Sequence, residues 1–248
     1  MMHRTYIAAL VTAAALVAAP AAFAATTDIS GAVSAAVADP GRPDADRMRD
    51  SARHPAEMLT FAEIKPGAKV VDLIPGGGYF TRVFSKTVGP DGKVYAFIPA
   101  AMPDRMAAAL DPVAKDPAYG NVVVLRQPSA DFAPPESVDV VWTAQNYHDL
   151  HNNGGNPAAL NLAIYQALKP GGVYVVIDHV AKSGTGVSDT STLHRIDPAV
   201  VKAEVTKAGF KFDGESTVLR RTDDPHTVKV FEMHDQTDQF AYRFKKPK

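Results

Sequence analysis

Apolar residues along this chain follow two rhythms, one typical of strands and one typical of helices. Runs rich in apolar and β-branched residues predict strands at Lys69 to Leu73, Lys93 to Ile98, Val122 to Leu125, Val138 to Thr143 and Val173 to Ile177. After the first strand, apolar residues repeat every three or four positions from Phe80 to Val88, which predicts a helix with one buried face. Strands that alternate with helices predict an α/β fold with a parallel sheet and helices on both faces.

Proline, glycine and capping side chains mark the boundaries of the remaining helices. The predicted helices are Pro43 to Asp50, Pro55 to Ile64, Pro103 to Leu110, Asn156 to Leu168 and Asp197 to Gly209. Asp50, Arg53 and His54 lie just ahead of the second of these helices. For these three we favour a solvated helix junction over contacts to a substrate.

The pattern changes toward the C-terminus. Two further strands are predicted around Ser216 to Arg220 and Gln239 to Lys245. The second alternates apolar and polar residues, as an edge or antiparallel strand does. For Arg221 to Asp238 a loop, an extra helix and an extra strand all stay open.

The N-terminus predicts export. His3 and Arg4 precede an apolar run from Ile7 to Ala19, and Ala22-Phe23-Ala24 has the small-x-small pattern of a cleavage site. We therefore predict a signal peptide over 1–24 and a periplasmic or otherwise exported protein, with no integral membrane segment after its removal. The following alanine-rich stretch, 25–40, predicts a flexible lead-in, and 41–248 predict a single domain.

Composition limits the partners and the forces that hold the fold. Lysine and arginine number 26 against 27 acidic residues, so no basic footprint for nucleic acid or an anionic membrane is visible. The sequence contains no cysteine, which excludes disulfides, thiolate metal sites and a cysteine nucleophile. The domain must therefore depend on its hydrophobic core.

A glycine cluster follows the first predicted strand. Asp72 ends that strand, Gly76-Gly77-Gly78 form a turn, and Tyr79 opens the next helix. Such a turn lets backbone approach a ligand, and free N–H groups at the start of the helix suit an anion or nucleotide. A tight strand-to-helix turn without a ligand is the alternative that these residues leave open.

Three motifs in order resemble the class I S-adenosylmethionine-dependent methyltransferases from about residue 45 to the C-terminus. They are the glycine turn, Ser137-Val138-Asp139-Val140-Val141-Trp142, and Leu168-Lys169-Pro170-Gly171-Gly172. The phrases PGGGYFTRVFS, QNYHDLH and LHRIDP look like those of a group of exported bacterial methyltransferases of unknown substrate. The resemblance implies a Rossmann-like, seven-stranded, mostly parallel sheet with one antiparallel strand and helices on both faces.

The resemblance also implies a cofactor, S-adenosyl-L-methionine. Carried over residue by residue, it assigns cofactor binding to Asp72, Gly76, Gly77, Gly78, Tyr79 and, near the adenine, Asp131. This chain departs from the family at two places. Ile74 stands where the motif has its first glycine, and after the second strand no acid that could hold the ribose follows until Asp104. Export adds a conflict, because this cofactor is made in the cytoplasm.

Three groups of polar residues are expected at the same edge of the sheet: two follow predicted strands, and one precedes a helix. They lie in Gln145 to Asn153, Asp178-His179 and Leu193 to Asp197. For methyl transfer, His148 is the candidate general base, oriented by Asp149 or Asp178, because an imidazole titrates near neutral pH. Asn146 and Tyr147 would position a small-molecule or protein acceptor.

Two alternatives to methyl transfer stay open. One is a non-catalytic periplasmic binding or accessory protein on a degenerate methyltransferase fold. The other is a metal-assisted enzyme that uses the His148, Asp149 and His179 cluster, to which His151 and Asp178 could add ligands. The spacing is no established ligand signature, so no residue is assigned to a metal. For Arg195 we favour a pair with Asp197 at the helix cap over a clamp on a ligand carboxylate.

Overall fold

The computed structural model describes residue 1, residues 29–152 and residues 154–248, and the predicted signal peptide lies outside these residues apart from Met1. In this part of the chain, seven strands form one sheet: β1 (Lys69–Leu73), β2 (Lys93–Pro99), β3 (Val122–Gln127), β4 (Val138–Ala144), β5 (Leu168–His179), β6 (Lys211–Ser216) and β7 (Gln239–Lys245). Their order is β3-β2-β1-β4-β5-β7-β6. β7 runs antiparallel to both β5 and β6, and the other pairs are parallel, so the expected sheet is confirmed.

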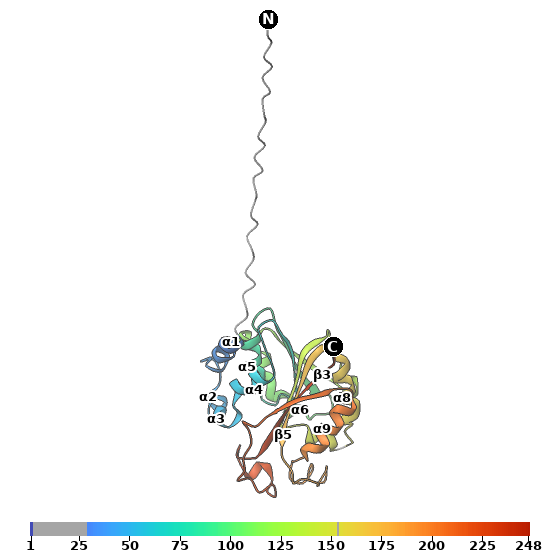
Figure 1. Ribbon diagram of the computed structural model, residues 1–248. Helices are drawn as coiled ribbons and strands as arrows, with labels where there is room; N and C mark the ends of the chain where they lie inside the picture. The colour runs from blue at the N-terminus through green and yellow to red at the C-terminus, as the bar shows by residue number, and fades with distance from the viewer. Residues whose placement is uncertain (2–28, 153) are drawn as a thin grey trace.

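Helices cover both faces of the sheet. The helices are α1 (Ile29–Val37), α2 (Asp44–Arg47), α3 (Asp50–Arg53), α4 (Pro55–Phe61), α5 (Tyr79–Val88), α6 (Asp104–Ala107), α7 (Asp111–Ala114), α8 (Pro157–Ala167) and α9 (Pro198–Lys207), with short 3-10 turns η1 (Ala108–Leu110), η2 (Pro117–Tyr119), η3 (Ser129–Asp131), η4 (His148–His151) and η5 (Val230–Glu232). α1, α4 and α5 lie on one side of the sheet, and α8 and α9 lie on the other (Figure 1).

Strand alternation explains why the sheet has two hydrophobic cores. Neighbouring residues of one strand point to opposite faces, so Val70 joins the core under α5 while Val71 joins the core under α8 and α9. The face of α5 predicted from its spacing is buried from Phe80 to Val88. Trp142 of β4 is fully buried and packs against Phe80, with ring centroids 4.7 Å apart. Burial on both faces holds the central strands rigid, and their carboxyl ends carry the site.

The prediction of a flexible lead-in is wrong from residue 29 onward. Ile29–Val37 forms α1, which packs against α4 and α5. Val33 and Ala36, three positions apart, are buried in the same core as Phe84. Small side chains let this helix approach its neighbours closely, and the segment belongs to the folded domain.

Several predicted boundaries shift. The last strand but one is Lys211–Ser216 and not Ser216 to Arg220, because Arg220 closes a turn onto Thr217 and Leu219 is buried against the sheet. The Pro-Gly-Gly phrase lies within β5 instead of ending the preceding helix, and Gly171 donates its N–H to Lys246. The predicted helices Pro43 to Asp50 and Pro103 to Leu110 each divide into short pieces.

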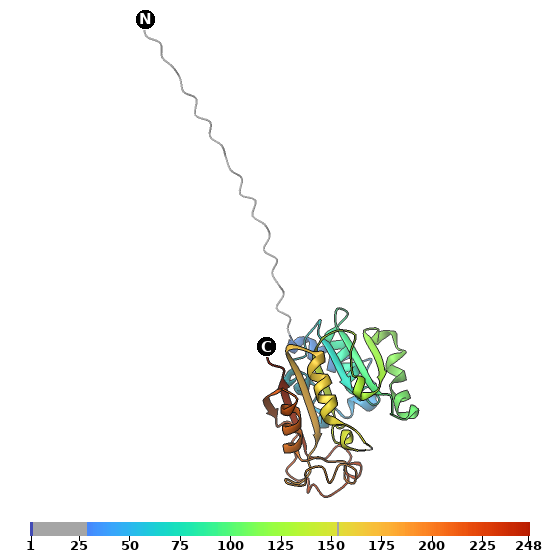
Figure 2. The same cartoon turned by 90° about the vertical axis from the view of Figure 1, so that its right-hand side faces the viewer.

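The segment 221–238, which had no assignment, is a loop that contains η5. Figures 1 and 2 show it, in red, beside the loops that follow β4 and β5, at the lower end of the sheet. A buried ion pair between Arg195 and Asp224 (Nη1 to Oδ2, 2.8 Å) joins two of these loops, and both side chains are fully buried. The predicted pair of Arg195 with Asp197 is wrong, since Asp197 instead caps α9 by accepting the N–H of Ala199.

Among the residues that the structure describes, none of the helices is both long enough and apolar enough to cross a lipid bilayer.

Candidate active site

The turn after β1 brings the glycine cluster to the carboxyl end of the sheet. Gly76 and Gly78 have φ angles of 56° and 82°, a conformation that glycine adopts without strain. A Cβ atom on Gly78 would lie 2.6 Å from Cγ2 of Val113, so a side chain has no room there. Apart from Gly76 itself and its two chain neighbours, no described residue has an atom within 4 Å of a Cβ placed on Gly76. The turn therefore presents open backbone on one side and packs tightly on the other.

A cavity of about 270 Å³ lies over this turn. Its lining comes from the N-terminal helices, the glycine turn and the end of β4: Asp46, Arg49, Arg53, Asp72, Ile74, Pro75, Gly76, Gly77, Tyr79, Phe80, Ala144, Gln145 and Asn146. Of the six cofactor residues predicted from sequence, four line the cavity, and Gly78 supports the turn from behind at the N-cap of α5. The predicted glycine turn therefore does border a space that can hold a ligand.

Arg53 is the cationic side chain closest to the glycine turn's aromatic wall. Its guanidinium lies 4.8 Å from the ring centroid of Tyr79 and 5.9 Å from that of Phe80. Within the described part of the chain its hydrogen-bond partner is Oε1 of Gln145 (2.9 Å), its buried Nε has none, and no carboxylate forms an ion pair with it. Burial and the nearby Arg49 lower the pKa of Arg53 to about 10, so it stays charged at neutral pH. A cation in this setting favours an anionic ligand.

The interpretation of Asp50 and Arg53 as a solvated junction is wrong. Asp50 accepts hydrogen bonds from Arg42 (2.6 Å) and from the hydroxyl of Tyr79 (2.5 Å), which fixes the tyrosine ring beneath Arg53. Arg49 is bonded to Asp235 (Nε to Oδ2, 2.7 Å) and thereby links the N-terminal helices to the C-terminal loop. The helix junction is thus one wall of the cavity.

Asp72 lies at the bottom of the cavity, at the end of β1. It is 3% exposed, and Oγ1 of Thr81 donates to its carboxylate (2.6 Å). Burial raises the pKa of Asp72 to about 7, although the bond from Thr81 and the charge of Arg53 act in the opposite direction. A cationic group bound above it would be attracted by the ionised form.

The residues expected to bind the adenosine part of the cofactor are less complete than those around the glycine turn. β2 ends at Pro99 without an acid, and Asp104, the next one, is exposed and paired with Arg126 (2.7 Å). Asp131 lies in the exposed turn η3 and outside the cavity lining, so its role near an adenine stays a prediction. The residues present fit the amino-acid end of S-adenosylmethionine, with a cation for its carboxylate and an open glycine turn, better than they fit its ribose.

A second polar cluster follows β4 and centres on His148. Its Nδ1 lies 2.9 Å from Oδ1 of Asp178, and both side chains are buried. The Asp178 carboxylate also accepts the backbone N–H groups of His148 (2.7 Å) and His179 (2.8 Å). Burial lowers the pKa of His148, but the charge of Asp178 and its hydrogen bond outweigh this, and the pKa lies above its usual value. Asp178 is therefore the orienting acid, and Asp149 lies instead near Nε2 (3.5 Å).

Tyr147 was predicted to position the acceptor, and this is wrong. Its side chain is fully buried, its hydroxyl donates to Glu204 (2.8 Å), and the same oxygen accepts from Asn161 (2.7 Å). Asn146 does line the cavity, but its amide nitrogen is bonded to the carbonyl oxygens of Ala144 (2.6 Å) and Ile74 (3.1 Å). It joins β4 to the glycine turn and leaves only its side-chain oxygen for a ligand.

The sequence-predicted metal set is only partly brought together. His151 faces Glu204 (3.2 Å), and His179 is bonded to Oγ1 of Thr237 (2.8 Å), so neither joins His148 and Asp149. Burial lowers the pKa of His179 to about 4. His194 takes the place beside His148 that was predicted for His179, with Nδ1 3.2 Å from Nε2 of His148.

Sequence reasoning assigned no role to two residues of the site, although it weighed a substrate contact for Arg53. Arg53 carried no signal beyond its position between two helices, and His194 lies 46 positions from His148. The phrase LHRIDP drew attention to the segment of His194, but only the loops after β4 and β5 bring it to His148.

Solved structures similar to this chain confirm the fold. An S-adenosylmethionine-dependent methyltransferase from Aquifex aeolicus aligns with a TM-score of 0.59 and 20% identity, over 82% of this chain and 98% of that one. An arsenic(III) S-adenosylmethionine methyltransferase from Chlamydomonas reinhardtii aligns with a TM-score of 0.57 and 19% identity, over 88% and 73% of the two chains. The cyclase SpnF aligns with a TM-score of 0.60 and 17% identity, over 82% and 81%.

These comparisons define a class of fold and not a reaction. No family model matches the sequence. The chain has the Rossmann-like fold of class I methyltransferases, and one of its structural neighbours is named for cyclisation instead of methyl transfer.

Proposed function

We propose that this protein binds S-adenosyl-L-methionine in the cavity over the glycine turn and transfers its methyl group to a small-molecule or protein acceptor. The observation that carries the proposal is Arg53, a cation without an acidic partner in the described chain, above a glycine turn that exposes backbone. A ligand with a carboxylate supplies the missing counter-charge. The fold neighbours support the same assignment.

Each group in the cavity has a role that follows from its chemistry. Arg53 binds the carboxylate of the amino-acid moiety, and the ionised form of Asp72 attracts its positive charge. Asn146 and Asp72 lie at the ends of adjacent strands and hold the ligand against the glycine turn. The bound cofactor supplies an electrophilic methyl group on a sulfonium.

His148 fits the role of the general base that receives the acceptor's proton. Asp178 holds its Nδ1, so Nε2, which faces His194 and Asp149, is the nitrogen left to receive a proton. Asp178 is buried and ionised, because contacts to His148 outweigh the effect of burial and lower its pKa. It stabilises the positive charge that His148 gains on taking a proton. Most of the rate would come from holding acceptor and cofactor together, which supplies about 7–11 kcal/mol in favourable cases.

Calorimetric titration of the purified protein tests the cofactor. We expect S-adenosylmethionine and S-adenosylhomocysteine to bind, and Arg53→Met to weaken both by about 10- to 150-fold, the equivalent of about 1.5–3 kcal/mol for a charge-assisted bond. The matched control is a ligand, 5′-methylthioadenosine, which lacks the amino-acid moiety. Its affinity should be the same for Arg53→Met and the parent protein. Absence of binding heat with millimolar S-adenosylmethionine would contradict the proposal. Equal losses of affinity for all three ligands in Arg53→Met would contradict the role given to Arg53.

The incomplete ribose site favours a second candidate, a binding protein that does not transfer the methyl group. No acid follows β2 in the place where a carboxylate would hold both ribose hydroxyls. Incubation of the protein with S-adenosylmethionine and candidate acceptors separates the two. Formation of S-adenosylhomocysteine supports catalysis, whereas tight binding without turnover supports the binding protein. Export, predicted from residues 1–24, stays a prediction.

A further inference from the structure

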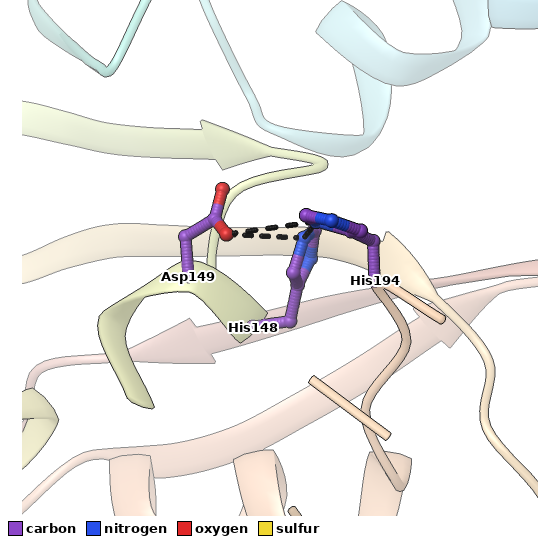
Figure 3. Close-up of side chains that lie close together, drawn as sticks. All are labelled: His148, Asp149 and His194. Atoms are coloured by element: carbon purple, nitrogen blue, oxygen red, sulfur yellow. Dashed lines mark hydrogen bonds and ion pairs between the residues drawn. The ribbon is translucent and has the colours of Figure 1, made fainter. Parts of the chain in front are cut away.

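Three side chains of types that bind metals in other proteins meet at one point after β4 (Figure 3). His148 and Asp149 come from the short helix η4, and His194 reaches them from the loop that precedes α9. Nε2 of His148 lies 3.2 Å from Nδ1 of His194 and 3.5 Å from Oδ1 of Asp149. Nδ1 of His194 lies 3.8 Å from the same oxygen.

We propose that this cluster binds a first-row divalent transition cation, with His148 Nε2, His194 Nδ1 and Asp149 Oδ1 as ligands. Ligand atoms in a tetrahedral site with bonds of about 2.0–2.1 Å lie about 3.3–3.4 Å apart. The three separations are all within about 0.5 Å of that value. Two imidazoles and one carboxylate are a donor set that zinc and iron(II) use in sites that keep an open position.

Asp178 supports the site from behind. It accepts from Nδ1 of His148, and two backbone N–H groups fix its carboxylate in place. This bond assigns the proton of His148 to Nδ1 and directs the lone pair of Nε2 toward the cluster. A buried carboxylate behind a ligating histidine is the arrangement that orients the ring and raises its basicity at metal sites.

When His148 is neutral, hydrogen bonds alone leave the cluster short of a proton. With Nδ1–H of the neutral His148 committed to Asp178, Nε2 of His148 and the Asp149 carboxylate are both acceptors. A neutral His194 has one ring proton to share between them at most. A cation at the centre satisfies all three groups, and Asp149 brings a negative charge that further favours it.

The cluster is open to solvent, and Phe231, which contacts one of its residues, also lines a second cavity. The side chains of Asp149 and His194 are 48% and 29% exposed, so an ion can enter. The ring of Phe231 contacts the His194 ring (centroids 4.7 Å apart) and lines a cavity of about 320 Å³ that also includes Arg49 and Gln145. If the proposed methyl transfer holds, an acceptor oxygen or sulfur in this cavity can take the open metal position. In that case His148 serves as a metal ligand and not as the general base. Coordination to the metal then activates the acceptor. Metal binding itself does not depend on that function.

Metal titration of tag-free protein, stripped by a chelator and dialysed, tests the site. We expect one equivalent of Zn²⁺ to bind by calorimetry and one equivalent of Co²⁺ to give visible absorption bands of a low-coordinate nitrogen and oxygen site. Asp178→Asn should weaken binding by about 10- to 100-fold, as loss of a supporting carboxylate does. His194→Asn and Asp149→Asn remove ligands and should weaken it further.

His226→Asn is the matched control. His226 resembles His194 in backbone conformation (φ 57° and 56°) and in side-chain exposure (25% and 29%), and asparagine tolerates this φ. We expect His226→Asn to bind Co²⁺ like the parent protein. The proposal is overturned if the parent binds less than one equivalent of either metal, or if His194→Asn, folded by circular dichroism, retains parental affinity. Titration of the metal-free protein with S-adenosylmethionine tests the proposed function separately.

Discussion

At the scale of single residues, Ile74 shows how this chain keeps the geometry of a glycine motif without the glycine. Its φ angle is 59°, a conformation that costs a β-branched residue about 1–3 kcal/mol. Two hydrogen bonds to its backbone hold it there. The N–H of Ile74 donates to the carbonyl oxygen of Phe97 (2.9 Å), and the side-chain amide of Asn146 donates to the carbonyl oxygen of Ile74 (3.1 Å). The turn is therefore dictated by its surroundings, and the Ile74 side chain becomes part of the cavity wall.

Asp72 predicts a pH dependence that one substitution should remove. Because its folded pKa of about 7 lies above the unfolded value of 3.8, the folded state binds its proton more tightly. The stability that this contributes is fully present below the unfolded pKa and is lost as pH rises through about 7. The shift of about three units corresponds to about 4 kcal/mol at most. We expect Asp72→Asn to be more stable than the parent by about 1–4 kcal/mol near pH 8, and by much less near pH 4.

Urea unfolding at both pH values measures the difference between the two proteins. Comparing variant with parent at each pH cancels the opposite effect of His179, whose lowered pKa of about 4 costs stability as the solution becomes acidic. A stability difference that stays constant from pH 4 to pH 8 would contradict the role given to Asp72.

At the scale of elements, α1 shows why the sequence pattern failed where side chains are small. Alanine and serine give little contrast between a buried and an exposed face, so Ile29–Val37 had no clear helical periodicity. Packing against α4 and α5 supplies the missing information, because it buries Val33 and Ala36 among the α1 residues whose side chains the structure describes. A weak local pattern also explains why the bounds of β6 were mispredicted, because a bulge at Gly214 breaks the alternation of its side chains.

An aspartate placed on each face of α1 tests whether the helix belongs to the folded domain. Val33→Asp puts a charge into the core, and we expect a loss of about 3 kcal/mol or more in the free energy of unfolding. Ala35→Asp adds the same residue on the exposed face of the same helix and should change stability by about 0.5 kcal/mol or less. Equal effects of the two substitutions, measured by denaturant unfolding, would mean that α1 does not pack on the domain in solution.

At the scale of the whole molecule, the loops after β4 and β5 and the segment 221–238 form one connected wall around the site. Arg195 joins the loop after β5 to the segment 221–238 by donating to Asp224 and to the carbonyl oxygens of Val180 (2.9 Å) and Val228 (3.0 Å). Arg49 adds a second link from the N-terminal helices to Asp235. His194 precedes Arg195, so this buried network also determines where His194 lies.

Arg195→Met should therefore cost far more than removal of an exposed arginine. It leaves Asp224 buried without its cation, for which we expect a loss of about 3–5 kcal/mol. Arg126→Met is the control, since its pair with Asp104 is exposed and should contribute less than about 1 kcal/mol. Chemical unfolding gives both values, and hydrogen exchange should show faster exchange of residues 221–238 in Arg195→Met only. Similar losses for the two variants would refute the structural role of this ion pair.

Sequence patterns over a few residues predicted most of the fold and part of the site. The apolar runs of β1, β2, β4 and β5, the glycine turn and the alternation of β7 were readable because each depends on residues close together in the chain. Asp72, Gly76 and His148 could be named for the same reason, since each belongs to a short motif at the end of a strand.

Tertiary structure alone decided which charged and titratable groups meet. It brought Arg53 over Tyr79 without an acidic partner, gave Asp178 to His148, and put His194 where His179 had been expected. It also removed Tyr147 from the site by burying its hydroxyl against Glu204. The physical reason is that secondary structure follows from periodicities over a few residues, whereas the pairing of distant side chains depends on loop paths and burial that no local pattern encodes.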